Sequence, residues 1–378
     1  MRRCLLRSLG ICAIGFAALG GARPGLFGAE REARRLDPAR LLVYLDERGA
    51  ERPVETAADW AVRRRAILEG MQAVMGELPD RSRLPPLDVR EVGRAEEADH
   101  VRIEISFVAE EGDRVPADLY LPKPKGAGEK HPAALALHPT HPLGKRAIGL
   151  GSPEPNRGYA PELARRGYIV IAPDYPSFGD YAYDFDRDRY VSGTMKGIFN
   201  HMRCVDLLVS RDDVDPERIA AIGHSLGGHN AIFVAAFDER IRAVVSSCGW
   251  TPFRDYYGGD ISGWTSPRYM PRLRDAYGLD PERVPFDFYE VIAALAPRAF
   301  FSSSPLRDAN FDVAGVRKAE AEARKVYRLL GAEGRFEVVC PDCGHDFPPE
   351  IRERAYRFLD GALRGPSGGA SGAARLNP

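Results

Sequence analysis

The chain has 378 residues, 44% of them apolar, so it can bury one large hydrophobic core, and its length would allow two domains. Lysine plus arginine (53) nearly balance aspartate plus glutamate (54), which leaves a net charge of −1. No strong field of one sign results, so the composition argues against a nucleic-acid or anionic-membrane partner and favours a small or neutral one. We expect one domain with additions.

Residues 1–22 have the features of an export signal. Two arginines follow Met1, a largely apolar stretch covers 8–21, and small residues at 20–22 suit a cleavage site. The apolar stretch is shorter than the roughly 20 residues that span a bilayer, so cleavage is favoured over a membrane anchor. The sequence therefore predicts a periplasmic or secreted protein with no stable membrane span. The arginine pair leaves the general secretory and twin-arginine routes both open.

Four cysteines follow the predicted signal, and Cys340 and Cys343 have the CxxC spacing of some zinc and redox sites. Zinc needs about four ligands, and the sequence has neither a second CxxC nor an HxxxH to complete such a site. We therefore expect no metal and no other cofactor. A local disulfide and two packed thiols both remain open for this pair.

The mature N-terminus is predicted to be a helical extension over 23–99. Between residues 31 and 79, apolar side chains recur every three or four positions with charges between them. Two antiparallel strands are expected next, at 101–107 and 115–121, because apolar and polar residues alternate on both sides of a Glu-Gly-Asp turn. Pro116 suits an edge strand better than a central one.

From residue 122 onward, short apolar strands alternate with helices, which is typical of a mostly parallel sheet covered by helices on both faces. The expected strands are 133–137, 168–172, 219–222, 241–245, 299–301 and 336–339. The expected helices are 159–166, 194–210, 226–237, 316–330 and 349–363. The sequence thus predicts about eight strands, with the antiparallel pair at the N-terminal edge, in a domain spanning 100–364. Residues 250–290 break the alternation as a cap-like insertion, and 365–378 are expected to be a disordered tail.

The segment after the strand at 219–222 carries the strongest chemical signal. It reads Gly-His-Ser-Leu-Gly over 223–227 and leads directly into an apolar helix. A sharp turn from strand to helix needs small residues two positions before and after the nucleophile, because larger side chains would collide with the neighbouring backbone. We therefore predict Ser225 as a nucleophile exposed on this turn. The backbone N–H of Leu226 would be one donor of an oxyanion hole.

A serine hydroxyl needs a base to take its proton, and His345 is the predicted base. It lies between the last predicted strand and the final helix, where the chain order serine, acid, histidine places the base. The acid should follow the strand at 299–301, where Asp308 and Asp312 are both candidates. We prefer Asp308, because it lies at the first turn after the strand, whereas Asp312 suits the N-cap of the next helix.

The other pocket residues are predicted from their loops. The second oxyanion donor should come from the loop after the strand at 133–137, where Thr140 is preferred because Pro139 has no N–H. His138, on the same loop, is expected to line the pocket. The insertion supplies three aromatic candidates for substrate binding, Trp250, Tyr257 and Trp264. Aromatic faces can stack on sugars, but the alternative is that these rings pack the cap as a small core.

These residues together make the region 101–363 resemble the α/β-hydrolase superfamily. It is most similar to the catalytic domains of dienelactone-hydrolase-like, acetyl-xylan-esterase-like and prolyl-oligopeptidase-type proteins, and the resemblance lies in 223–227, in 172–179 and in the Gly-His pair at 344–345. It implies the α/β-hydrolase fold, with Asp174 holding its loop. Dienelactone hydrolases use a cysteine where this chain has Ser225, so their substrate is not carried over. Fewer than about eighty mature residues precede the first strand, too few for the propeller of prolyl oligopeptidases.

The sequence therefore predicts an exported serine hydrolase that cleaves a carboxylic ester through an acyl-enzyme, with a small-molecule or carbohydrate ester as substrate. One alternative is a serine peptidase or amidase of the prolyl-oligopeptidase type. The other is a catalytically silent binding protein, although such a protein would need none of the three residues Ser225, His345 and Asp308. The acyl group, the alcohol and the oligomeric state are not determined by the sequence.

Overall fold

The computed structural model describes residues 35–123, 130–149 and 151–363. The predicted signal (1–22) and tail (365–378) lie outside these residues. Among the helices that the structure describes, none combines the length and apolarity needed to cross a bilayer.

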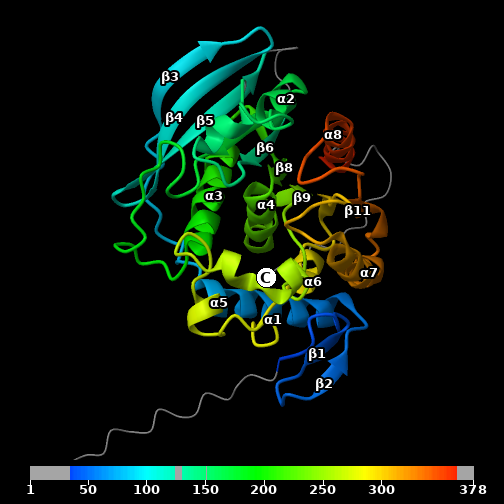
Figure 1. The fold of residues 1–378 in the computed structure, drawn as a ribbon. Coiled ribbons are helices and arrows are strands. Elements are labelled where there is room, and N and C mark those ends of the chain that lie inside the picture. The colour runs from blue at the N-terminus through cyan, green and yellow to red at the C-terminus, as the bar shows by residue number, and fades with distance from the viewer. Residues whose placement is uncertain (1–34, 124–129, 150, 364–378) are drawn as a thin grey trace, which may run out of the picture. The chain divides into compact units, whose positions relative to one another are not determined.

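A nine-stranded sheet forms the centre of the fold, in the order β11-β10-β9-β8-β6-β7-β5-β4-β3 (Figure 1). Its strands are β3 (Arg90–Glu96), β4 (His100–Glu110), β5 (Asp113–Pro122), β6 (His131–Leu137), β7 (Ile169–Pro173), β8 (Val214–His224), β9 (Ile241–Ser247), β10 (Ala299–Ser303) and β11 (Phe336–Val339). Strands β6 to β11 pair in parallel, whereas β3, β4 and β5 are antiparallel to their neighbours. The predicted mostly parallel sheet with an antiparallel N-terminal edge is confirmed.

The ninth strand, β3, lies within the stretch predicted as helical. Its sequence, Arg-Glu-Val-Gly-Arg-Ala-Glu, is mostly charged and exposed, so it shows no alternation of buried and exposed positions. It forms because β4 offers an open edge of backbone donors and acceptors. The expected edge position of Pro116 is wrong, because β5 lies between β4 and β7. The proline is tolerated because pairing with β7 begins one residue later, at Ala117.

Two hydrophobic layers cover the sheet. Helices α1 (Ala57–Met75), α3 (Gly193–Val209), α4 (Leu226–Phe237), α6 (Phe288–Ala293) and α7 (Val313–Leu329) contribute to one layer, and α2 (Tyr159–Arg165) and α8 (Pro349–Leu363) to the other. Neighbouring residues of β6 alternate between them: Leu135 belongs to the first layer, and Ala134 and Ala136 to the second. Because both faces are buried, these strands are continuously apolar.

The N-terminal extension contains one helix rather than a helical domain. A small hairpin of β1 (Val43–Leu45) and β2 (Glu51–Pro53) precedes α1. Asp46 closes the hairpin turn by accepting hydrogen bonds from the backbone of Arg48 and Ala50, and this local bonding displaces the predicted helix. The helix itself begins at a capping box, in which Thr56 and Asp59 each accept from the other's backbone N–H.

The insertion at 250–290 consists of short elements that share the main core. They are η2 (Tyr256–Gly259), η3 (Ile261–Trp264) and α5 (Arg272–Asp275), with α6 starting at its end. The remaining short helices are η1 (Gly144–Ile148) and η4 (Glu333–Arg335). Phe253, Leu273 and Phe286 of the insertion are fully buried in the same apolar layer as α1 and α4.

A buried ion pair fastens α1 to this layer. Arg63 of α1 donates to Glu290 of α6 at 2.6 Å, and the two side chains are 6% and 3% exposed. The neighbouring Arg64 donates to the backbone carbonyls of Ala294 and Ala236. Leaving one buried charge without its partner is costly, so this contact makes α1 part of the cooperative fold.

Replacing Arg63 by methionine should lower the free energy of unfolding by about 3–5 kcal/mol, because the buried Glu290 then loses its ion pair with Arg63. Urea denaturation followed by circular dichroism measures this. Arg94→Met is the matched control, since Arg94 pairs with Glu91 on the exposed strand β3, and it should change stability little. If both variants lower the free energy of unfolding equally little, α1 is not an integral part of the fold.

Candidate active site

The turn between β8 and α4 presents Ser225. Its φ of 55° and ψ of −123° lie in a region that non-glycine residues rarely adopt. The strain is imposed by the surroundings: a Cβ on Gly223 would collide with the backbone of Gly227, and one on Gly227 with the carbonyl of Leu137. Ser225 N also donates to Ser247 O of β9 at 2.8 Å. The two glycines therefore let strand and helix approach closely enough to hold the serine in this conformation.

His345 lies on the loop between β11 and α8, and the structure places it beside Asp308. Its Nδ1 is 2.9 Å and 3.0 Å from the two carboxylate oxygens. The Asp308 side chain is only 1% exposed, and its Oδ1 also accepts from the backbone N–H groups of Asn310 and Phe311. Burial by itself would raise the pKa of Asp308, but the hydrogen bond and charge of His345, with Asn310 N–H and the Cys248 thiol, bring that pKa below its usual value.

Asp312 has a different position. Its carboxylate accepts from Ala314 N at 2.7 Å and caps α7, as its place before the helix suggested. An acid must reach His345 Nδ1 to hold the imidazole in one tautomer. Of the two aspartates on this loop, the geometry favours Asp308 for that task.

Ser225 and His345 both line a cavity of about 410 Å³. No hydrogen bond joins their side chains among the residues that the structure describes, which is common in ligand-free sites, where such bonds shorten only with substrate bound. The imidazole of His345 lies between two rings, with the centroid of His224 4.8 Å away and that of Phe311 5.9 Å away. Burial, with the charges of Arg157 and His345, holds the pKa of His224 well below its usual value, so the ring next to His345 is neutral.

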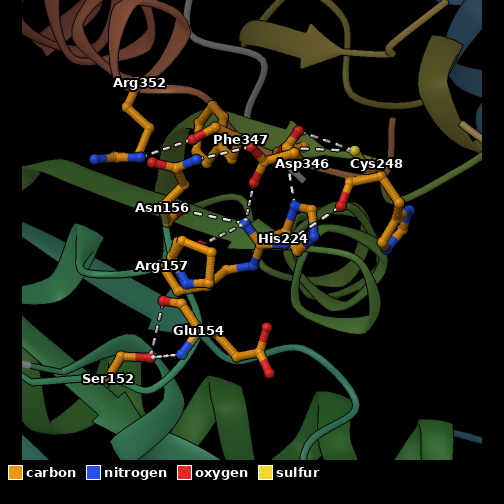
Figure 2. A network of polar contacts seen from close by, with 12 residues as sticks. Ser152, Glu154, Asn156, Arg157, His224, Cys248, Asp346, Phe347 and Arg352 are labelled. Carbon is orange, nitrogen blue, oxygen red and sulfur yellow. Dashed lines mark hydrogen bonds and ion pairs between the residues drawn. The ribbon is translucent and has the colours of Figure 1, made fainter. Parts of the chain in front are cut away.

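A polar network holds the loop that carries His345 (Figure 2). Arg157 donates to Asp346 Oδ1 at 2.7 Å and to the carbonyl of His345 at 3.3 Å. Asn156 donates to the other oxygen of Asp346, and Cys248 Sγ lies 3.4 Å from the Asp346 carbonyl. This network fixes the backbone from His345 to Asp346.

Sequence reasoning missed this network. Arg157 precedes α2 and lies 189 residues from Asp346, so no local pattern links them. The only available signal was a carboxylate directly after the predicted base, in a loop expected at the site. An arginine that is almost fully buried is the structural sign that it has a paired role.

The two predicted oxyanion donors lie at the same cavity. Leu226 is the first residue of α4, so its N–H points out of the positive end of that helix. Thr140 follows Pro139 on the opposite wall, and its hydroxyl is 3.0 Å from that of Tyr269. Both residues thus line the cavity that contains Ser225, and their role as oxyanion donors stays a prediction.

His138 departs from its expected place. It is buried, its Nδ1 is 2.7 Å from Pro139 O, and its Nε2 accepts from Tyr175 N at 2.9 Å. The ring therefore ties the loop after β6 to the loop after β7 and does not line the cavity. Burial lowers its pKa, so it remains a neutral acceptor. Asp174 lies in the same loop region and accepts from both the backbone and the side chain of Lys145, which fastens the two loops further.

Of the three aromatic residues predicted to bind substrate, only Trp264 lines the cavity. Trp250 is 1% exposed and donates from Nε1 to Ser302 Oγ, so it packs in the core as the alternative reading had it. Tyr257 is 57% exposed and does not line the cavity itself, although its hydroxyl bonds to Asn310, which does. Tyr256 and Tyr269, two other rings of the insertion, complete the aromatic wall.

The cysteines do not form a separate centre in the described structure. Cys340 and Cys343 are both free thiols. The residues close enough to share a metal are His224, Cys248 and His345, with ligand atoms within 4.8 Å of one another. His345 Nδ1 is bonded to Asp308, and the Cys248 thiol contacts Ser247 Oγ and the Asp346 carbonyl. These ligand atoms therefore already have protein partners.

Known proteins share this sequence pattern and fold. The family model described as prolyl oligopeptidase family matches residues 158–298. The protein named Putative hydrolase YtaP, from Bacillus subtilis, is 30% identical over 298 residues, which cover 76% of this chain and 95% of YtaP. Carbohydrate esterase MZ0003, from an unknown prokaryotic organism, is 26% identical over 190 residues, which cover 47% and 44% of the two chains.

Solved structures give the same picture of the fold. A glucuronoyl esterase from Solibacter usitatus superposes with a TM-score of 0.67 at 20% identity, covering 88% of this chain and 100% of its own. An acetyl xylan esterase from Paenibacillus sp. R4 superposes with a TM-score of 0.54 at 18% identity, covering 78% and 99%. At such low identity these likenesses establish a shared architecture.

Asp308→Asn should slow covalent labelling of Ser225 by a fluorophosphonate probe by roughly 10⁴-fold, because the amide favours the wrong tautomer of His345. Asp312→Asn is the control, since asparagine caps a helix as well as aspartate does, and it should change neither labelling nor melting temperature appreciably. If Asp312→Asn is the slow variant, the roles of the two aspartates are reversed.

Proposed function

Since the chain belongs to the α/β-hydrolase superfamily, we propose that it is an exported serine esterase that cleaves a carboxylic ester through an acyl-enzyme intermediate. Ser225 would be the nucleophile, His345 the general base and Asp308 its acid partner. The observation that carries the proposal is the buried Asp308 bonded to His345 Nδ1, with the same histidine lining one cavity together with Ser225 on its strained turn.

The chemistry follows from this arrangement. His345 Nε2 takes the hydroxyl proton as Ser225 Oγ bonds to the ester carbonyl carbon, and the carbonyl oxygen becomes an oxyanion. The Leu226 N–H, at the positive end of α4, and the Thr140 N–H would stabilise that charge. The bond from carbon to the alcohol oxygen then breaks, and His345 returns its proton to the leaving alcohol. Water repeats the sequence on the acyl-enzyme, releasing the acid and Ser225.

Asp308 acts on the histidine rather than on the substrate. Its carboxylate accepts from Nδ1, which leaves Nε2 unprotonated and available to take the proton of Ser225, and its negative charge stabilises the imidazolium that forms. The low pKa of Asp308 keeps this charge present. Arg157 and Asn156 hold Asp346, and through it the loop, so that the imidazole needs little reorganisation during the reaction.

A carbohydrate ester is the substrate class that we propose. The wall of the cavity combines three rings, Tyr256, Trp264 and Tyr269, with polar groups that suit a hydroxylated substrate. Two of the similar proteins named above are carbohydrate esterases by name, which supports this class. No step of the reaction requires a metal or cofactor, because the three side chains and the backbone donors carry acyl transfer.

A peptidase or amidase is the second candidate, favoured by the match of residues 158–298 to the prolyl oligopeptidase family model. The two candidates share the nucleophile, so aryl esters do not separate them. Acetylated sugars and peptide anilides assayed side by side do. We further propose that residues 1–22 are a cleaved signal and that the mature protein acts in the periplasm or outside the cell, on the strength of the basic and apolar composition of that segment.

Ser225→Ala and His345→Ala should each lower kcat on 4-nitrophenyl acetate by roughly 10⁴–10⁶-fold, and the double variant should be no worse than either one, because nucleophile and base act as a unit. Steady-state kinetics and probe labelling measure the loss, with circular dichroism to show that the fold is kept. Substantial labelling of Ser225→Ala would overturn the assignment. If the fluorophosphonate probe does not label the wild-type protein, the hypothesis of a catalytically silent binding protein is supported instead.

Trp264→Ala should raise KM and change the ranking of acetylated sugars more than it changes kcat on a small aryl ester, because Trp264 lines the cavity without touching the proton transfers. Trp250→Ala should instead destabilise the protein by about 3–5 kcal/mol with the ranking unchanged. The exposed Tyr257→Ala is the control for both measurements. If the ranking of acetylated sugars stays the same in all three variants, Trp264 does not contribute to substrate selection.

A further inference from the structure

A second cavity, of about 450 Å³, lies beside the one that contains Ser225. The two cavities have consecutive residues in their walls: Arg268 lines the second and Tyr269 lines the first. Ser177 lines the second cavity, while its neighbour Phe178 packs in one apolar cluster with Leu226, the residue after the nucleophile. The walls of the two cavities therefore meet at Arg268 and Tyr269.

Arg268 is the feature that distinguishes this cavity. Its Nε donates to Ser177 Oγ at 2.8 Å, and its guanidinium lies over the ring of Phe178, 4.4 Å from the centroid. Within the described part of the chain, no carboxylate lies within ion-pair distance of it, and its two terminal nitrogens have no acceptor. A half-buried guanidinium that is oriented in this way keeps N–H groups available for a ligand.

The backbone around Arg268 shows that its position is built. Ser177 has a φ of +70°, which a non-glycine residue adopts at a cost, and in this conformation its hydroxyl accepts from Arg268. From the other side, Tyr175 donates its hydroxyl proton to the carbonyl of Arg268 at 2.7 Å. Arg268 is thus held at its guanidinium by the strained Ser177 and at its backbone by the buried Tyr175, both in the loop after β7.

The opposite wall supplies complementary groups. The rings of Tyr183 and Phe185 are half-buried and 5.1 Å apart, at 69° to each other. The Asp186 carboxylate lines the same cavity and has no partner among the described residues. The site therefore offers an aromatic face, guanidinium donors and a carboxylate acceptor. The charges of Arg268 and Asp186 offset each other, and the carboxylate of Asp184, which also lines the cavity, pairs with Arg187 at 3.3 Å. Sugar hydroxyls both donate and accept, so a neutral sugar ring matches this set better than an ion of either sign.

We propose that this second cavity is a subsite for a further neutral sugar unit, beyond the unit whose ester Ser225 attacks. The inference rests on the proposed carbohydrate esterase function and adds that the substrate is an oligosaccharide or polysaccharide. Arg268 and Asp186 hydrogen-bond the hydroxyls of that unit. Binding energy gained there raises kcat/KM for long substrates and contributes nothing for a single sugar.

The test compares acetylated methyl glycosides with the corresponding acetylated trisaccharides, for xylose and for mannose. Wild-type protein should show a kcat/KM about tenfold or more higher for the trisaccharide of at least one sugar, and Arg268→Gln should remove most of that advantage through KM. Asp186 is exposed, so Asp186→Asn should not affect folding. It should also reduce the ratio of kcat/KM for the trisaccharide to kcat/KM for the single sugar. The matched control is Arg274→Gln, in the same insertion, because Arg274 is exposed and its side chain, among the described residues, bonds only its neighbour Asp275. Its ratio should stay at the wild-type value.

A binding measurement separates this inference from the proposed function. Isothermal titration of Ser225→Ala protein with xylotriose and mannotriose should show about tenfold weaker binding when Arg268→Gln is added. If wild-type protein cleaves no ester but binding still depends on Arg268, the esterase proposal fails and the subsite stands. The subsite is overturned if trisaccharides gain nothing over single sugars, or if Arg268→Gln changes neither the ratio nor the affinity. It is equally overturned if Arg274→Gln matches the effect of Arg268→Gln.

Discussion

The steric constraint at the turn from β8 to α4 governs the rest of the site. Ser225 can hold its strained backbone only because Gly223 and Gly227 let the helix approach the strands within backbone contact. That closeness also sets where α4 begins, so that the positive end of the helix, with the Leu226 N–H, lies directly after Ser225. A side chain at either glycine would push the helix away and displace the proposed nucleophile and the proposed oxyanion donor together.

The parallel sheet brings the other residues of the site to Ser225. The loops after β6, β7, β9, β10 and β11 all start at the same edge as the serine, because parallel strands end together. Those loops supply Thr140, Asp308 and His345, and Arg157 crosses between two of them to hold the base. The insertion then adds aromatic rings above this edge. Its residues pack into the main apolar layer, so the wall is supported by the same core that supports the catalytic groups.

The polar groups of the two cavities differ in how they are paired. The groups near Ser225 are engaged: Asp308 with His345, Arg157 with Asp346, and the neutral His138 with the backbone of Tyr175. Arg268 and Asp186, one cavity away, have no such partners in the described structure. Paired groups hold geometry at low cost of reorganisation, whereas unpaired groups that are already oriented can gain hydrogen bonds from a ligand. This difference in pairing is the reason for proposing the second cavity as a binding subsite.

The sequence by itself determined the parts of this protein whose information is local. Apolar strands buried on both faces, the helix at 349–363 and the glycine-bracketed serine all follow from short-range patterns, and the structure has the strands and the helix where they were expected. Chain order suggested His345 and narrowed the acid to two aspartates. Only the tertiary structure decided between their positions, because the distance from Asp308 to His345 depends on how β10 and β11 pair. It also decided that Trp250 and His138 are buried, that β3 adds to the sheet edge and that Arg157 meets Asp346. Each of these contacts joins segments far apart in the chain or depends on packing from several elements, and no local pattern records such contacts.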